Sequence, residues 1–214
     1  MQDVEHNPEP GTTTASRVVV IAASFGGLQA IRTVLATLPE AFPAPIAVVL
    51  HRAVAPADPL ARILARDCQL AVRAAANLAP LLAGTVAVFP AGHRCGVAPN
   101  HRVRVRPADG QRLSADLVMQ DAAHHYQAGT IGVVLTGKLA DGAQGVRGVK
   151  RAGGTVIVQD PAECAAAGMP TAALATGCVD HTLPLAMIGP TLIALAMAPG
   201  VAELGGPQAT EMTL

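Results

Sequence analysis

Three residues of types that work together in hydrolases, Ser24, His51 and Asp141, each come at or shortly after the end of an apolar stretch. A serine hydroxyl becomes a nucleophile when a neighbouring base takes its proton. A histidine acts as that base when a carboxylate fixes its tautomer and stabilises the imidazolium that forms. The three residues therefore supply one candidate for each role of a catalytic triad, provided that the fold brings them together.

The apolar stretches before these residues are typical of strands buried on both faces of a parallel sheet. They cover residues 18–23, 46–50 and 130–135. Because the C-terminal ends of parallel strands meet along one crevice, residues far apart in the sequence can meet there. Each residue also has a simpler interpretation. Serine is a common helix N-cap, Asp141-Gly142 is a common turn and cap pair, and a histidine at a strand end often only completes a hydrogen bond.

Strands and helices alternate along the chain, which predicts an α/β fold: a three-layer α/β/α sandwich around a mostly parallel, doubly wound, Rossmann-like sheet. We expect polar tails over residues 1–16 and 199–214 and a single domain over 17–198. Further strands are expected over 69–74, 85–89, 102–106, 155–158 and 178–183. Helices are expected over 28–38, from Asp58-Pro59, from a Ser114 cap to about Tyr126, around Val146 and Val149, and from Pro184 to about Met197.

The composition excludes several classes of protein. The 214 residues are 51% hydrophobic with a formal net charge of zero, so no overall basic field attracts nucleic acid. No apolar run approaches the ~18 residues of a membrane span and no secretory signal is visible, so we expect no membrane insertion and a cytoplasmic location. The four cysteines form no Cys-x-x-Cys pair, and we expect no metal site and no cofactor. Nothing in the sequence indicates an oligomeric state.

Residues 102–106 alternate arginine and valine, which indicates a peripheral or edge strand with one buried and one solvated face. The arginines of this run, with Arg112 nearby, have two interpretations. They form a basic stripe for an acidic helix, or they are a solvated face that discourages edge-to-edge aggregation, the commoner role of such charges.

Several short motifs make the chain resemble the catalytic domain of the CheB-type chemotaxis protein-glutamate methylesterases. Each motif is weak by itself, but they occur in the family's order across about residues 17–195. They are Ala22-Ala23-Ser24-Phe25-Gly26-Gly27, Val49-Leu50-His51, Leu135-Thr136-Gly137 followed by Asp141-Gly142-Ala143, Gln159-Asp160, and Gly168-Met169-Pro170.

The resemblance implies a serine hydrolase in which Ser24 is the nucleophile, His51 the base and Asp141 the residue that orients the base. Its substrates would be γ-glutamyl methyl esters on the cytoplasmic helices of chemoreceptors, and often glutamine side chains as well. It also implies that Met169 lines the crevice, although a packing role fits this residue equally. No cofactor is implied.

The turn after the first strand provides the expected oxyanion donors. Backbone N–H groups around Phe25, Gly26 and Gly27, together with the loop at Lys138, lie where the turn geometry would present them to a substrate carbonyl. A third interpretation of the same turn is a small-molecule or phosphate site at a helix N-terminus.

The chain departs from the family's usual residues at several positions. Phe25 replaces a threonine, and Lys138-Leu139 replaces Met-Gly. Arg52-Ala53 replaces an apolar residue and a proline after His51, and Leu113 replaces a proline. A cation near His51 lowers the basicity of the imidazole, although it can also stabilise an oxyanion, and leucine does not readily adopt positive φ. The alternative to an active esterase is therefore a catalytically impaired, receptor-binding relative.

Regulated members of this family carry an N-terminal receiver domain that is phosphorylated. In this chain only a short polar tail precedes residue 17. We therefore expect that control by phosphorylation acts in trans or is absent.

Overall fold

The computed structural model describes residues 16–55, 57–108 and 114–197. These residues form a seven-stranded sheet in the order β3-β4-β2-β1-β7-β8-β9, in which every neighbouring pair is parallel. Its strands are β1 (Val18–Ala23), β2 (Ile46–Leu50), β3 (Ala71–Ala74), β4 (Thr85–Val88), β7 (Thr130–Val134), β8 (Thr155–Gln159) and β9 (His181–Leu183). The tails expected at 1–15 and 199–214 lie outside the described residues.

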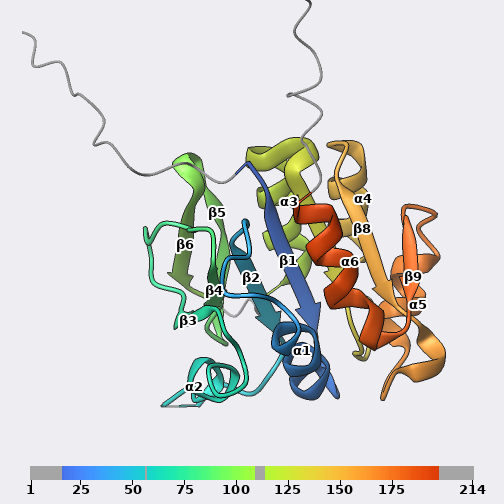
Figure 1. Ribbon diagram of the computed structural model, residues 1–214, viewed down its shortest axis with the longest axis horizontal. Helices are drawn as coiled ribbons and strands as arrows, with labels where there is room; N and C mark the ends of the chain where they lie inside the picture. The colour runs from blue at the N-terminus through green and yellow to red at the C-terminus, as the bar shows by residue number, and fades with distance from the viewer. Residues whose placement is uncertain (1–15, 56, 109–113, 198–214) are drawn as a thin grey trace, which may run out of the picture.

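Helices cover both faces of this sheet (Figure 1). One layer contains α1 (Gly27–Ala36), α2 (Leu60–Leu64) and α6 (Leu185–Met197), and the other contains α3 (Ala115–Tyr126), α4 (Ala143–Arg151) and α5 (Gly168–Leu174). The predicted three-layer α/β/α sandwich is confirmed. Among the described helices, none is both long and apolar enough to span a bilayer.

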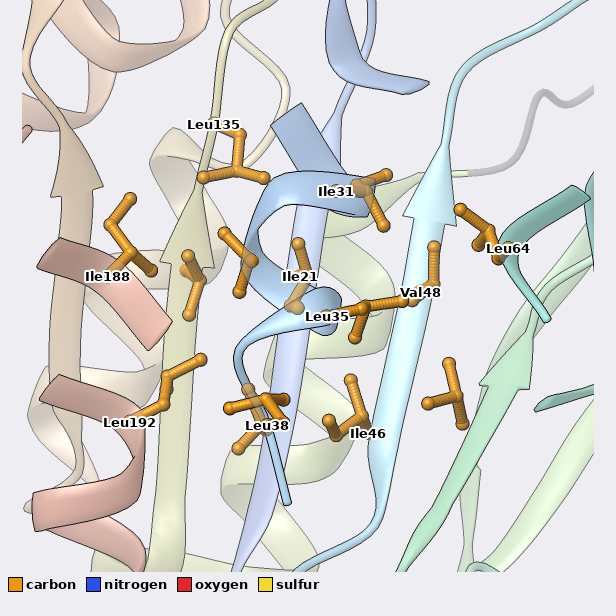
Figure 2. Close-up of a cluster of buried hydrophobic side chains, with 14 of the residues drawn as sticks. Ile21, Ile31, Leu35, Leu38, Ile46, Val48, Leu64, Leu135, Ile188 and Leu192 are labelled. Atoms are coloured by element: carbon orange, nitrogen blue, oxygen red, sulfur yellow. The ribbon is translucent and has the colours of Figure 1, made fainter. Parts of the chain in front are cut away.

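The central strands are buried on both faces because their residues alternate between two separate cores. Val19 and Ile21 of β1 pack in one core with Ile31 and Leu35 of α1, as Figure 2 shows for several of these side chains. The alternate residues of β1, such as Val20, face the second core under α3 and α4. This double burial explains the continuous apolar runs by which the sequence identifies these strands.

The topology places a crevice at the C-terminal end of β1. From β1 the sheet continues to β2 on one side and to β7 on the other. Strand order reverses at this point, and ligand sites of open α/β sheets lie at such reversals. All three candidate catalytic residues follow one of these three strands.

One strand was not predicted. β5 (His93–Ala98) pairs antiparallel with β6 (Arg102–Pro107), and the two form a separate two-stranded sheet. The sequence signal is weak because Gly96 interrupts the strand and only its central residues are buried. The peripheral position expected for the arginine-valine run is confirmed, whereas the strand expected over 178–183 is only His181–Leu183.

Candidate active site

Ser24, His51 and Asp141 line one pocket of about 670 Å³ at the C-terminal edge of the sheet. Leu50, Arg52, Ala53, Val54, Ala91, Gly92, Lys138 and Leu139 complete its wall. The fold therefore brings together the three residues singled out by their chemistry. Among the described residues, no group of three or more His, Cys, Asp or Glu side chains could hold a metal.

Ser24 lies in a tight turn between β1 and α1 that is fixed by the backbone. The Gly27 N–H donates to the Ser24 carbonyl at 2.9 Å, and the Ser24 N–H donates to the Thr136 carbonyl at 3.0 Å. Gly26, with a φ of 77°, takes the left-handed conformation that glycine adopts at low cost. Ser24, the candidate nucleophile, is therefore tied to the loop after β7 as well as to its own turn.

Glycine at 137 allows this close approach. A Cβ at Gly137 would lie 2.9 Å from the Ser24 Cβ and 2.2 Å from the Met169 Sδ, closer than real side chains come. The side chain of Met169 is fully buried behind this contact and does not line the pocket. Of the two roles expected for Met169, the structure shows packing.

His51 follows β2 directly beside Ser24. Its N–H donates to the Ala23 carbonyl at 2.9 Å, which continues the β1–β2 ladder to the residue before Ser24. Its Nε2 lies 2.8 Å from the Asp141 Oδ2. A neutral imidazole carries one proton, and placing that proton on Nε2 toward the carboxylate leaves Nδ1 as the basic nitrogen.

The carboxylate of Asp141 is held by the start of α3. Its oxygens accept hydrogen bonds from the Ser114 hydroxyl at 3.0 Å, the Ala115 N–H at 2.7 Å and the Asp116 N–H at 3.1 Å. Burial alone would raise the pKa of Asp141, but the His51 contact and these backbone N–H groups outweigh it and lower the pKa to about 2. Asp141 is therefore ionised and fixed in orientation, as a residue that orients a base requires.

Asp116 in turn accepts hydrogen bonds from the loop that carries Asp141 and from the start of α4. Its Oδ1 accepts from the Gly142 N–H at 2.9 Å and the Gly145 N–H at 2.6 Å at the start of α4. Burial and the neighbouring charge of Asp141 raise the pKa of Asp116. Asp141 thus accepts from N–H groups at the N-terminus of α3, and Asp116 accepts from N–H groups at the N-terminus of α4. These hydrogen bonds join the two helices beside the site.

The expected cap by Ser114 is wrong in detail. Ser114 occupies the N-cap position of α3, but its side chain makes no capping hydrogen bond and donates to Asp141 instead. Asp141 caps α3 from a distant part of the chain. Sequence reasoning considered Asp141 as a local cap and as a catalytic carboxylate, and the structure shows that one carboxylate faces both a helix end and His51.

Arg52 is a further residue of the pocket, which sequence reasoning identified only as a departure from the family's usual residue and gave no role. Its guanidinium donates to the Leu50 carbonyl at 2.8 Å and to the Phe89 carbonyl at 2.9 Å, and it forms an ion pair with Asp58. It thereby joins the ends of β2 and β4 to the start of α2. The side chain of Arg52 holds the loop after His51. A single arginine forms no sequence pattern from which this role could be predicted.

Three of the departures from the usual family residues, Phe25, Lys138 and Leu139, lie together at the exposed rim of the pocket, and Leu113 lies outside the described residues. The Lys138 ammonium lies 4.7 Å from the centroid of the Phe25 ring, a cation–π contact. Phe25 is 55% exposed and Leu139 is 82% exposed. Leu139 adopts a φ of 67°, so the loop keeps the left-handed conformation that leucine disfavours.

Not all of the expected oxyanion donors can face a substrate. The Gly27 N–H is engaged by the Ser24 carbonyl, so it does not face a substrate. The Thr136 hydroxyl lies 3.0 Å from the Phe25 carbonyl and fixes this peptide. The N–H groups of Phe25, Gly26 and Lys138 remain the candidates.

Comparison with known proteins identifies the family. The model of the CheB methylesterase family matches residues 19–192. This chain belongs to that family. A solved structure, the CheB methylesterase catalytic domain of Thermotoga maritima, superposes with a TM-score of 0.79 at 34% identity, covering 84% of this chain and 98% of that one.

Curated CheB relatives agree with this assignment. A protein-glutamate methylesterase/protein-glutamine glutaminase of Anaeromyxobacter dehalogenans is 41% identical over 81% of this chain and 52% of its own length. The protein-glutamate methylesterase FrzG of Myxococcus xanthus is 34% identical over 90% of this chain and 60% of its own. The chain thus spans about half to three-fifths of these relatives.

Proposed function

We propose that this chain is a serine hydrolase that removes methyl esters from glutamate side chains of chemoreceptors in chemosensory adaptation. The observation that carries the proposal is the 2.8 Å contact between His51 and an Asp141 carboxylate held ionised, beside Ser24 in one pocket. The names of the relatives, protein-glutamate methylesterases, support the substrate class. Receptor regions of this kind are cytoplasmic, and we place the enzyme there.

The reaction follows from the roles of the three side chains. Ser24 Oγ attacks the γ-carbonyl carbon while His51 Nδ1 takes the hydroxyl proton, and the Asp141 carboxylate stabilises the imidazolium. Backbone N–H groups of Phe25, Gly26 and Lys138 receive the oxyanion. The tetrahedral intermediate collapses, methanol leaves with the proton from His51, and a glutamyl-serine ester remains.

Water then completes the cycle. His51 takes a proton from the water as its oxygen attacks the acyl carbon, and the proton passes to Ser24 Oγ as the ester bond breaks. The products are the free enzyme and the glutamic acid side chain, which releases its proton to solvent and becomes a carboxylate. A glutamine side chain would give the same acyl-enzyme with ammonia as the leaving group, in keeping with the second activity in several relatives' names.

The competing proposal is a receptor-binding relative in which the departures at the rim abolish the chemistry. Two observations favour the active enzyme. Lys138 rests on the Phe25 ring, and the His51 ring contacts the Asp141 carboxylate. In addition, the loop through Leu139 keeps a left-handed turn despite the loss of glycine.

The test is release of methanol from a methylated chemoreceptor fragment by the wild-type chain and by Ser24→Ala. We expect release by the wild type alone, with both proteins binding the fragment. Binding without release by the wild type would contradict the enzyme and support the impaired relative. Release that persists in folded Ser24→Ala would contradict the assignment of the nucleophile.

A further inference from the structure

A second pocket, of about 430 Å³, lies on the two-stranded sheet of β5 and β6. It is lined by Arg94, Arg104, Arg106 and Pro107. The chain as a whole has a formal net charge of zero, so three arginines around one hollow are a local concentration of positive charge. We call this hollow the arginine pocket.

The strand register directs these guanidinium groups to one face. Arg94 lies directly opposite Arg106, and Gly96 lies opposite Arg104. The alternate residues, such as Val97 and Val103, are buried on the other face. Like charges directly opposite each other in an antiparallel pair are destabilising, so the Arg94–Arg106 pair costs folding free energy.

Only one of the three arginines has a protein carboxylate as partner within the part of the chain that the structure describes. Arg104 pairs with Asp121 of α3, which reaches over Gly96, where a Cβ would lie 1.9 Å from the Asp121 carboxylate. For Arg94 and Arg106, no carboxylate of the described residues comes within ion-pair distance. Among the described residues, these two adjacent guanidinium groups therefore face no protein carboxylate.

The arginine pocket lies next to the catalytic pocket. Gly92 lines the catalytic pocket, and Arg94 follows it by two residues, a span of at most about 7 Å along the backbone. β6 ends at Arg106 and Pro107 on the same side of the molecule as the C-terminal end of β1 (Figure 1). Arg102, at the start of β6, lies at the far end of the hairpin.

We propose that Arg94 and Arg106 bind carboxylates of an acidic segment that flanks the scissile ester in the substrate protein. This inference rests on the proposed function. Demethylation leaves a glutamate, so a segment with several such sites presents carboxylates wherever an ester is absent. Guanidinium groups bind carboxylates through paired N–H donors, and Arg94 follows a residue of the catalytic pocket, Gly92, by only two positions.

The test compares two synthetic helical peptides that carry one glutamyl γ-methyl ester, flanked in one by glutamates and in the other by glutamines. The variant is Arg94→Gln/Arg106→Gln. The control is Arg147→Gln/Arg151→Gln, which removes the same charge from the half of α4 that runs away from the catalytic edge. Methanol release gives kcat and KM, and fluorescence anisotropy gives the affinity for each peptide.

We expect the variant to raise KM for the glutamate-flanked peptide roughly three- to tenfold, the effect of losing two exposed charge pairs, with kcat unchanged. The KM for the glutamine-flanked peptide should not change. The control should behave as the wild type, and the wild-type preference for glutamates should weaken as salt is added. Arg94→Lys/Arg106→Lys should restore part of the preference, because the charge remains while the forked geometry is lost.

Equal KM values of variant and control for the glutamate-flanked peptide would overturn the inference. So would inhibition by inorganic phosphate that is lost in the variant while the wild type shows no preference between the peptides, since that would assign the pocket to a phosphate ligand. If the wild type hydrolyses neither peptide, the proposed function fails. The anisotropy measurement then still decides whether the two arginines bind the acidic peptide.

Discussion

Around the catalytic pocket, some polar groups are held by several hydrogen bonds, whereas other residues of the rim are exposed to solvent. The carboxylate of Asp141 accepts hydrogen bonds from three groups at the start of α3 and also contacts His51. The exposed part of the rim is formed by Phe25, Lys138 and Leu139, of which Lys138 and Phe25 form a cation–π pair.

Of the departures from the family's usual residues, Phe25, Lys138 and Leu139 fall on the exposed rim, whereas Arg52 and Ala53 belong to the pocket wall. The groups that must hold a proton in one place are those with the most hydrogen bonds, and preorganised groups contribute most to catalysis. The difference indicates that catalysis depends on the hydrogen-bonded groups around Asp141 and His51. The exposed residues of the rim can vary with the substrate. The predictions below test this division, beginning with the largest effect.

Removing the charge of Asp141 should cause the largest loss. Asp141→Asn keeps the shape of the side chain but no longer stabilises the imidazolium, and we expect kcat/KM to fall roughly 10⁴-fold by analogy with other triads. Phe25→Thr at the rim is the matched control and should change kcat/KM less than tenfold on a small ester. Steady-state methanol release measures both, and equal losses would remove the distinction between the hydrogen-bonded groups and the exposed rim.

Asp116 should act as a positioning residue. Asp116→Ala removes the acceptor for the Gly142 and Gly145 N–H groups, and we expect kcat/KM to fall roughly ten- to a hundredfold, as when other supporting hydrogen bonds are lost. Asp116→Asn retains an acceptor oxygen and should recover most of the activity. If Asn is as inactive as Ala in equally stable proteins, the hydrogen bonds to α4 are not what positions Asp141.

The low pKa of Asp141 predicts a pH dependence of stability. Because the folded-state pKa is about 2 and the unfolded value is near 4, the ionised carboxylate stabilises the folded protein above about pH 4 by about 2 kcal/mol. This contribution is lost as the pH falls toward 2. Asp116, whose pKa is raised, contributes with the opposite sign and reduces the total.

Denaturant unfolding of wild type and Asp141→Asn from pH 7 to pH 2 measures this contribution. The difference in free energy of unfolding should be greatest near neutrality and disappear at the acid end. Asp67→Asn, at an exposed ion pair with Arg32, is the control and should show a smaller difference. A difference that does not change with pH would contradict the carboxylate's role.

Leu139→Gly should have the smallest effect, and it should stabilise. Glycine relieves the left-handed strain at a φ of 67°, and an 82% exposed leucine loses little burial, so we expect a gain of up to about 1 kcal/mol in the free energy of unfolding. Leu82→Gly, at an exposed leucine without positive φ, should instead lose stability. Thermal unfolding distinguishes the two, and a loss at both sites would show that the turn is not strained.

The sequence was sufficient to predict the architecture and that the three candidate catalytic side chains meet in one pocket. Strands buried on both faces give continuous apolar runs, and the residues after β1, β2 and β7 necessarily share one edge of a parallel sheet. β5 was missed because Gly96 leaves no alternating pattern.

The supporting residues could not be predicted because their partners are far away in the chain. Arg52 binds the Phe89 carbonyl, and Asp116 binds N–H groups 26 and 29 residues further along. Ser114 was identified as a cap, but which acceptor its hydroxyl meets depends on the loop after β7. Such pairings arise only when the layers pack.

The central claim, that His51 and Asp141 activate Ser24, is tested most directly by covalent labelling with a fluorophosphonate, since this small reagent needs no receptor. Intact-mass kinetics and peptide mapping follow the adduct in wild type, His51→Ala and Asp141→Asn. We predict one adduct at Ser24 in the wild type and labelling at least about a hundredfold slower in both variants. Equal rates in the three proteins, or an adduct at another residue, would contradict the account.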